Sequence, residues 1–260
     1  MTQQTLAGTH AIITGGSRGI GAAIATALAA RGASITLMSR SIDALRARAA
    51  LMESMGATVQ FKDCNVADER SVARAFRDAQ STFGPAGILV NNAGIAKSAK
   101  FLETSRAAWD DVMSVNVTGT FLCCQQVLPA MLEAKRGRIV NMSSTAGLRG
   151  YRTMSAYCAS KHAVIGLTRS LAQETAKHGV TVNAVCPGYT ETDLVEDAIS
   201  NIVRSLGKTR EEARAMLVAL NPRGVMTSSS EVAEAVAWLC EPAAQAVNGI
   251  ALPIAGGEVT

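Results

Sequence analysis

The sequence predicts an α/β fold in which helices cover both faces of one parallel β-sheet. Short β-branched segments alternate along the chain with longer segments rich in alanine and leucine, and this rhythm is typical of a doubly wound sheet. Hydrophobic residues make up 48% and charged residues 18% of the 260 residues, which is enough apolar surface for a sizeable core. We therefore expect a single domain over residues 1–260.

The first half of the chain carries four strand patterns, each a short run of apolar and β-branched residues. In chain order these expected strands are His10–Thr14, Ala33–Met38, Thr58–Asp63 and Ile88–Asn91. An amphipathic segment follows each of the first three strands and predicts a helix. These expected helices are Ile20–Arg31, Ser41–Met55 and Glu69–Phe83.

The second half continues the same alternation with longer helices. The expected elements, in order, are a helix at Trp109–Met131, a strand at Arg138–Ser143, a helix at Ser155–His178, a strand at Val180–Cys186, a helix at Glu231–Leu239 and a strand at Ile250–Ile254. No linker composition or internal repeat separates these elements, which favours one continuous sheet.

One stretch, at about residues 189–230, departs from the rhythm. It has helical patterning at Asp193–Leu206 and Arg210–Leu220 but stands between two regular elements. Ligands of doubly wound folds bind outside the carboxyl ends of the strands, so an insertion after the Val180–Cys186 strand is placed to cover a substrate. The alternative is a surface excursion used for packing between subunits.

Charge and cysteine content exclude several classes of function. The formal net charge is +4, and no dense basic stripe with interleaved aromatics occurs, so nucleic-acid binding is not expected. No C-x-x-C pair is present, so we expect neither a metal site nor a disulfide framework. Small core residues of a cytoplasmic protein explain the six cysteines better: Cys64, Cys123, Cys124, Cys158, Cys186 and Cys240.

Nothing in the sequence predicts a membrane protein. Met1–Gly8 is polar and has no apolar signal-peptide core. The longest apolar runs are interrupted before the ~18 residues that a membrane span requires.

A glycine-rich loop joins the first expected strand to the first helix. Its sequence is Thr14-Gly15-Gly16-Ser17-Arg18-Gly19-Ile20-Gly21. Glycines let a diphosphate approach backbone N–H groups, and the following helix N-terminus carries partial positive charge. The G-x-x-x-G-x-G spacing within T-G-x-x-x-G-I-G resembles the short-chain dehydrogenase/reductase family, whose members have a single Rossmann-like domain.

The end of the second strand indicates which nicotinamide cofactor is used. NAD-specific sites place an acidic residue there for the ribose 2′-hydroxyl, but this strand continues as Ser39-Arg40-Ser41, with no carboxylate before Asp43. Arg40, joined by Arg18 from the glycine loop, is suited to a 2′-phosphate. The pair resembles NADP-preferring family members, and the alternative is that Arg40 is simply solvated. We expect NADP(H).

Two further segments resemble cofactor-lining parts of the family. Cys64-Asn65-Val66 stands where an Asp-Val pair commonly contacts adenine, and the Asn65 carbonyl can still accept a hydrogen bond from the adenine amine. Residues 91–94 match the family's N-N-A-G segment. The resemblance implies the cofactor-binding residues Gly15, Ser17, Arg18, Gly19, Ile20, Gly21, Arg40, Asn65, Val66, Asn92, Ala93, Gly94, Tyr157, Lys161, Pro187, Gly188, Thr190 and Thr192.

Tyr157 and Lys161 stand four apart on an expected helix and therefore share a face. Carbonyl reduction requires a proton donor and alcohol oxidation a base, yet free tyrosine has a pKa near 10. A cation at ~4 Å and an effective dielectric of ~20 contributes about 4 kcal/mol, equivalent to roughly three pKa units. The spacing thus predicts a phenol whose pKa is lowered by the ammonium.

The family resemblance adds two catalytic residues. Ser144 stands thirteen residues before Tyr157 in Asn141-Met142-Ser143-Ser144-Thr145-Ala146-Gly147, and it would hold the substrate oxygen; Ser143 is the alternative if the register slips. Asn116 would hold a water that links Lys161 to a proton relay. The other interpretation of Asn116 is a buried amide that bends the helix, and both interpretations can be true at once.

The remaining motifs concern the nicotinamide and the assembly. Residues 186–192 match the family turn P-G-x-x-x-T, whose backbone and Thr192 would grip the carboxamide. Ile254-Ala255-Gly256-Gly257 departs from the usual D-G-G near subunit contacts. His162 points off the Tyr157–Lys161 face and is interpreted as a packing or surface residue.

We expect an enzyme that transfers a hydride between NADP(H) and a carbonyl or secondary alcohol, in the reductive direction. The 189–230 region is similar to that of 3-hydroxybutyrate dehydrogenases and aromatic-polyketide ketoreductases, which implies a 3-oxoacyl compound or thioester. Sugar, steroid and aromatic-ketone substrates are alternatives, as is a catalytically silent NADP-binding sensor or partner subunit. The resemblance implies a homotetramer or homodimer.

Overall fold

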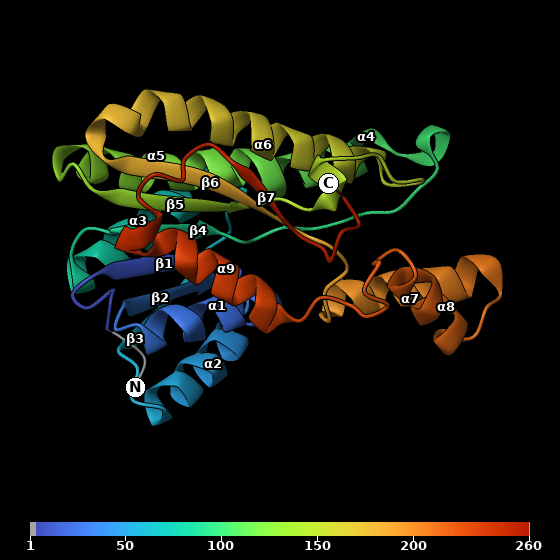
Figure 1. Cartoon of the computed structure of the whole chain (residues 1–260), viewed down its shortest axis with the longest axis horizontal. Helices are drawn as coiled ribbons and strands as arrows, with labels where there is room; N and C mark the ends of the chain where they lie inside the picture. Colours follow the sequence, from blue (N-terminus) through green and yellow to red (C-terminus); the bar gives the residue numbers. More distant parts are fainter. Residues whose placement is uncertain (1–3, 260) are drawn as a thin grey trace.

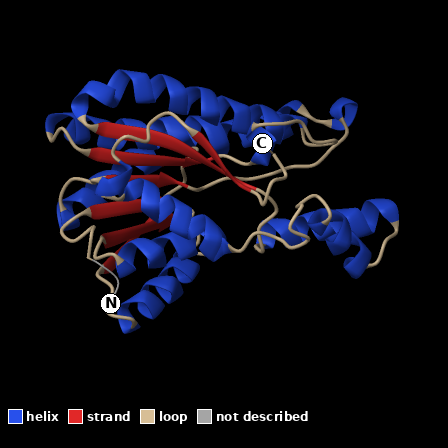
Figure 2. Cartoon of the chain, viewed as in Figure 1, coloured by secondary structure: helices blue, strands red, loops and turns tan. Residues whose placement is uncertain are grey.

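The computed structural model describes residues 4–259, apart from the side chains of Asp193 and Leu194. The two ends of the expected domain, residues 1–3 and 260, lie outside the described residues. The described chain forms one seven-stranded sheet with helices packed against both faces (Figures 1 and 2). The predicted α/β fold is confirmed.

All strand pairs in the sheet are parallel, and the strand order is β3-β2-β1-β4-β5-β6-β7. The strands are β1 His10–Thr14, β2 Ser34–Ser39, β3 Val59–Asp63, β4 Ile88–Asn91, β5 Gly137–Met142, β6 Val180–Pro187 and β7 Ala251–Ile254. Successive strands are added on one side of β1 up to β3 and on its other side from β4 onward. A crevice therefore opens at the carboxyl ends of β1 and β4, where such folds bind ligands.

The helices divide into two layers. Their bounds are α1 Gly19–Ala30, α2 Ile42–Ser54, α3 Glu69–Phe83, α4 Arg106–Met113, α5 Gly119–Glu133, α6 Ser155–Thr175, α7 Asp193–Leu206, α8 Arg210–Val218 and α9 Ser229–Cys240. Apolar residues of α1, α2 and α9 form one core with the sheet, and those of α3, α5 and α6 form another. Figure 1 shows α5 and α6 on one side of the sheet and α1, α2 and α9 on the other.

Strand β1 shows why two separate cores form. Successive side chains of a strand point to opposite faces, so Ile12 packs in the core with α3 and α5, whereas Ala11 and Ile13 pack in the core with α1 and α9. All three are fully buried. A strand buried on both faces is a continuous apolar run, and that run is what made His10–Thr14 predictable.

The predicted helix at Trp109–Met131 is longer and less regular than expected. The helical segment runs from Arg106 to Glu133 and contains a π-helical turn, Ser114–Thr118, between α4 and α5. By length and composition this segment is apolar enough to cross a membrane, contrary to the expectation from the apolar runs. A helix of a buried core passes the same test, and Val127 and Met131 of α5 are fully buried against the sheet.

The irregular stretch forms a helical hairpin that protrudes from the sheet. Helices α7 and α8 enclose a small core of their own, made by Val195, Ile199, Ala213, Leu217 and Met226. A parallel bridge between Thr190 and Thr227 closes the base of the hairpin. Figures 1 and 2 show α7 and α8 standing away from the layered body.

Candidate active site

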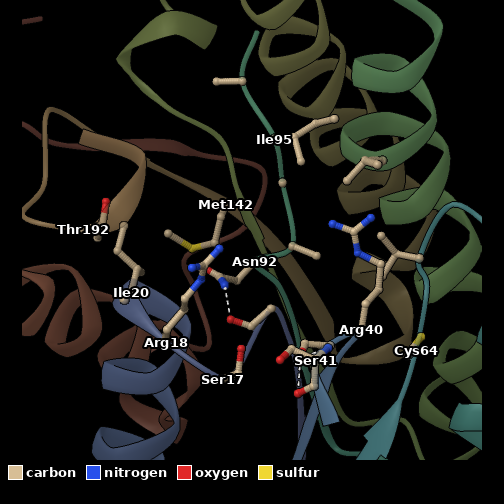
Figure 3. A pocket seen from close by; sticks show the side chains of 18 of the residues that line it. Ser17, Arg18, Ile20, Arg40, Ser41, Cys64, Asn92, Ile95, Met142 and Thr192 are labelled. Carbon is tan, nitrogen blue, oxygen red and sulfur yellow. Dashed lines mark hydrogen bonds between the residues drawn. The ribbon is translucent and has the colours of Figure 1, made fainter. Parts of the chain in front are cut away.

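A cavity of about 980 Å³ opens at the carboxyl ends of the central strands (Figure 3). Its size lies in the range of sites for nucleotide-sized ligands. Fifteen of the predicted site residues line it: Gly15, Ser17, Arg18, Gly19, Ile20, Arg40, Asn65, Val66, Asn92, Ala93, Gly94, Tyr157, Lys161, Pro187 and Thr192. The chain thus brings the predicted loop, strand ends and catalytic helix to one hollow.

The glycine loop is folded so tightly that side chains are excluded from it. Gly15 has φ +64° and Gly19 has φ +54°, in the left-handed region that favours glycine. A Cβ on Gly21 would lie 2.3 Å from the Gly15 carbonyl oxygen and 2.4 Å from the Asn92 side-chain nitrogen. Gly21 therefore does not line the cavity itself. It lets α1 begin directly beneath the loop.

Asn92 fixes the loop to the neighbouring strand. Its Nδ2 donates to the carbonyl oxygens of Thr14 at 3.1 Å and Gly15 at 3.0 Å. The Thr14 hydroxyl in turn accepts the backbone N–H groups of Asn92 and Ala93, both at 3.1 Å. The loop after β1 and the segment after β4 are therefore held as one rigid surface.

Two arginines line the cavity. Arg18 comes from the glycine loop and Arg40 follows β2, and Figure 3 shows them on either side of the serines at positions 17 and 41. Asp43, the first carboxylate after β2, is exposed and pairs with Arg46 at 3.1 Å. The part of the cavity nearest Arg40 is thus cationic.

Asn65 is less available than the sequence predicted. Its side-chain oxygen accepts the backbone N–H of Ala67 at 3.2 Å, and its backbone N–H donates to the Ser71 hydroxyl at 3.1 Å. One lone pair of the amide oxygen remains for a ligand. The turn holds Asn65 and Val66 on the cavity wall.

Tyr157 and Lys161 line the cavity together. Both project from one face of α6, and the Lys161 nitrogen lies 5.6 Å from the centre of the Tyr157 ring. The ammonium donates to the Met142 carbonyl oxygen at the end of β5 at 2.8 Å. Helix α6 and strand β5 therefore fix the position of the ammonium together.

Burial, and not the cation, dominates the proton affinity of the tyrosine. Burial raises the pKa of Tyr157 to about 12, and a hydrogen bond with the Ser144 side chain opposes this rise. Burial also lowers the pKa of Lys161 to about 8. The prediction that the ammonium lowers the pKa of the phenol below its ordinary value is wrong for this arrangement, because desolvation of the phenolate is the largest cause of the shift and raises the pKa.

The two adjacent serines have different partners. Ser143 is buried, and its hydroxyl donates to the Lys161 carbonyl oxygen at 3.0 Å. Ser144 caps the short helical turn at residues 145–147 by accepting the Ala146 N–H at 3.1 Å, and its side chain is the hydrogen-bond partner of Tyr157. Ser143 supports the helix backbone, whereas Ser144 faces the phenol.

Asn116 lies in the π-helical turn between α4 and α5 and is fully buried. Its Oδ1 accepts the Ile95 N–H at 2.9 Å, and its Nδ2 donates to the Ile95 carbonyl oxygen and to the Ser160 hydroxyl, both at 2.9 Å. The amide thus ties the segment after β4 to the catalytic helix. A Cβ on Gly94 would lie 3.3 Å from Asn116 Oδ1 and 3.5 Å from the Lys161 nitrogen, so the three positions adjoin. Such π-helical turns often occur at functional sites.

The segment after β6 closes the cavity from a third side. Pro187 and Thr192 line it, and the Thr192 methyl carbon lies 3.2 Å from the position of a Cβ on Gly19. Gly188 and Thr190 do not line it. The buried Thr190 hydroxyl donates to the Gly188 carbonyl oxygen at 3.0 Å, which stabilises the base of the hairpin.

Sequence reasoning missed several lining residues. They include Ser39, Ser41, Ala44, Cys64, Ile95, Ala96, Val115, Met142 and Asp197. Ser143, the predicted alternative to Ser144, also lines the cavity, whereas Ser144 and Asn116 do not. Most of the missed residues are sequence neighbours of predicted positions, but Asp197 comes from α7 of the protruding hairpin. No motif marks Asp197, because only the fold brings α7 to the cavity. His162 is exposed and its ring nitrogen contacts the Cys158 carbonyl oxygen at 2.9 Å, away from the cavity.

Comparison with known proteins gives a consistent result. The family model described as short chain dehydrogenase matches residues 9–202. The 2-(S)-hydroxypropyl-CoM dehydrogenase 3 of Xanthobacter autotrophicus is 39% identical over 94% of this chain and 94% of its own. The 3-oxoacyl-[acyl-carrier-protein] reductase of Escherichia coli is 35% identical, covering 96% and 97%. A crystal structure of an actinorhodin polyketide ketoreductase variant with NADPH is 36% identical, with a TM-score of 0.94 over 99% of both chains.

Proposed function

The chain belongs to the short-chain dehydrogenase family and is an oxidoreductase acting on carbonyl or CH–OH groups, and we propose that it uses NADPH to reduce a 3-oxoacyl-type ketone. The catalytic residues in this proposal are Ser144, Tyr157, Lys161 and Asn116. The observation that carries it is the geometry around one cavity: Tyr157 and Lys161 line it together with Arg18 and Arg40, and the Ser144 side chain is a hydrogen-bond partner of Tyr157.

The residues present fit a dinucleotide with a 2′-phosphate. The closely packed glycine loop leaves backbone N–H groups at the start of α1 for the diphosphate. Arg18 and Arg40 would hold the 2′-phosphate by charge-assisted hydrogen bonds. A nicotinamide ring would lie among Pro187, Thr192 and Tyr157.

The side chains divide the chemistry of ketone reduction among them. NADPH, when bound, supplies the hydride. The Ser144 hydroxyl donates to the substrate carbonyl oxygen and stabilises the negative charge that develops there. The Tyr157 hydroxyl, whose pKa lies well above neutral pH, gives its proton to that oxygen. Lys161 would then return a proton to the phenolate, and Asn116 would hold a water that links Lys161 to a proton relay.

The protonation states favour the reductive direction. A phenol with a pKa of about 12 is present at neutral pH as the acid, and an ammonium with a pKa of about 8 is mostly protonated there. Reduction consumes a proton at the substrate oxygen, so the enzyme starts from the form that this step requires. Oxidation would first require removal of a tightly held proton.

The helical hairpin at about 189–230 is proposed to cover the substrate. It begins directly after the residues that border Tyr157, and Asp197 of α7 already lines the cavity. The same family membership leads us to propose a homotetramer or homodimer located in the cytoplasm.

The test is cofactor oxidation with a panel of ketones. NADPH and NADH are compared with 3-oxoacyl thioesters, cyclic ketones and keto sugars, with Tyr157→Phe as the inactive reference. We expect turnover with NADPH and a 3-oxoacyl compound, and a loss of at least a hundredfold in Tyr157→Phe. Binding of NADPH without turnover of any ketone would instead indicate a silent cofactor-binding protein.

A further inference from the structure

A carboxylate from the C-terminal segment packs against the turn that follows β6. Glu258 is partly buried, and one of its oxygens accepts a hydrogen bond from the Tyr151 hydroxyl. Its other oxygen, Oε2, lies 2.9 Å from the position that a Cβ would take on Gly188. Gly188 follows Pro187, which lines the cavity together with Tyr157. The carboxylate therefore adjoins the turn that borders the catalytic tyrosine.

Tyr151 holds Glu258 in this position. The Tyr151 hydroxyl also hydrogen-bonds the Thr145 hydroxyl at 2.8 Å, and Thr145 directly follows Ser144. Burial, followed by the bond to Glu258, raises the pKa of Tyr151, so the phenol stays protonated and remains a donor. The end of the chain is thus connected to the loop between Ser144 and Tyr157, 107 residues away in sequence.

The charge of Glu258 acts on Tyr189, which directly follows the Gly188 turn. Burial raises the pKa of Tyr189, and the negative charge of Glu258 raises it further. Tyr189 in turn lies near enough to Tyr157 to affect its proton affinity.

Two cations lie near Glu258. Arg149, whose charge opposes that of Glu258 at Tyr189, is exposed and lies 4.9 Å from the Tyr151 ring centre. Arg223, which packs against Gly256 of the same segment, is paired with Glu231 at 2.7 Å.

We propose that Glu258 makes the site selective for 3-oxo compounds whose carbonyl substituent is neutral, such as esters and thioesters, over free 3-oxo acids. The inference rests on the proposed function, because it takes the ketone oxygen to lie between Ser144 and Tyr157. The carboxylate of a free 3-oxo acid is only two carbons from that ketone. It would therefore be held in the field of Glu258, whereas an ester carries no charge there.

Repulsion between two carboxylates is large enough to make the site prefer the ester to the free acid. Two unit charges of like sign on the order of 8 Å apart, at an effective dielectric of about 20, weaken binding roughly thirtyfold. Repulsion of this kind acts equally on the bound substrate and on the transition state, because the carboxylate takes no part in the reaction. The difference between the acid and the ester should therefore appear as a higher KM for the acid, and kcat for the acid should be little changed.

The experiment compares ethyl 3-oxobutanoate with 3-oxobutanoate in the full-length protein with NADPH. Glu258→Gln removes the charge and keeps the shape and the acceptor oxygen for Tyr151. Tyr151→Phe keeps the charge but releases the carboxylate from its position. Glu53→Gln, at an exposed position of α2, removes a charge of the same sign away from the site and serves as the matched control.

We expect the ratio of kcat/KM for the acid to that for the ester to rise at least tenfold in Glu258→Gln, through KM for the acid. Tyr151→Phe should shift the ratio in the same direction by a smaller factor, and Glu53→Gln should stay within twofold of the parent. Thermal unfolding of each variant checks that the fold is kept. Because Tyr151→Phe changes the position of the carboxylate by another route, its ratio decides the matter if Glu258→Gln does not fold.

Two results would overturn the inference in distinguishable ways. A parent protein that reduces both compounds, with a ratio unchanged in Glu258→Gln and Tyr151→Phe, would remove Glu258 from substrate selection and leave the proposed function standing. A parent protein that reduces neither compound nor any other ketone of the panel would instead overturn the proposed function.

Discussion

The ammonium nitrogen of Lys161 lies 5.6 Å from the centre of the Tyr157 ring and donates to the Met142 carbonyl oxygen at 2.8 Å. The cation is thus tied to the end of β5 and not directly to the phenol. Burial gives the two groups separate proton affinities, because it raises the pKa of Tyr157 and lowers that of Lys161. It leads to the first two predictions.

The rate of ketone reduction should fall as pH rises above about 8. Burial lowers the pKa of Lys161 to about 8, so the ammonium is lost above that pH while Tyr157 stays protonated. We expect kcat/KM to decrease about tenfold per pH unit beyond pH 8, as for loss of one required proton. In Lys161→Arg, whose guanidinium stays charged, whatever activity remains should not decline in this range. A parent profile that is flat to pH 10 would contradict the assignment.

Lys161 should also make stability depend on pH. The pKa of Lys161 is about 8 in the folded protein and 10.5 in its ordinary state, so between these values the unfolded chain binds more protons. Stability contributed by this group therefore rises with pH through that window. Relative to Lys161→Met, the free energy of unfolding of the parent should increase by roughly 3 kcal/mol from pH 7.5 to pH 10.5. Chemical denaturation at a series of pH values measures it.

Ser144→Ala and Ser143→Ala should affect different properties. Loss of the Ser144 hydroxyl removes a donor to the substrate oxygen, and we expect kcat to fall by about 10²–10³ with little change in unfolding temperature. Ser143→Ala breaks a buried hydrogen bond to the Lys161 carbonyl oxygen, which should lower the free energy of unfolding by about 1–2 kcal/mol. Its loss of activity should be smaller than that of Ser144→Ala. The reverse pattern would exchange the two roles. Steady-state kinetics and thermal unfolding on the pair decide it.

Arg40→Ala should reduce the preference for NADPH. Removing a charge-assisted bond to the 2′-phosphate is expected to raise KM for NADPH by about ten- to a hundredfold, with KM for NADH nearly unchanged. Arg77→Ala, at a side chain 72% exposed on α3, is the matched control and should leave both constants unchanged. Equal effects on the two cofactors in Arg40→Ala would argue that the arginine does not read the phosphate.

Gly21→Ala and Gly166→Ala should have opposite effects on stability, although both glycines lie in helices. A Cβ at position 21 would stand 2.3 Å from the Gly15 carbonyl oxygen, whereas nothing lies within 4 Å of one at position 166. Gly21→Ala should therefore distort the glycine loop, weaken NADPH binding at least tenfold and lower stability. Gly166→Ala should raise stability by up to about 1 kcal/mol, because alanine favours a helix over glycine. Cofactor titration and thermal unfolding measure both.

Local pattern predicted most of the elements of the fold. Four of them, β1, α3, β4 and α7, have the predicted bounds, and the other strands differ by one residue at one or both ends. This accuracy has a physical cause, since strands buried on both faces are short apolar runs and the helices between them show an apolar face. No local sequence pattern predicts the π-helical turn at Ser114–Thr118, because its hydrogen-bond partners, Ile95 and Ser160, are distant in sequence.

The sequence by itself determined the identity and order of the chemical groups: the glycine loop, the two arginines, and the pairing of Tyr157 with Lys161 on one helix face. Only the tertiary structure decided which of two adjacent serines faces the phenol and that burial outweighs the cation in setting the pKa of Tyr157. It also placed Glu258 beside Gly188. Spacing along a chain fixes neighbours within one helix or strand, whereas desolvation and contacts between remote segments arise only when the layers of the fold pack together.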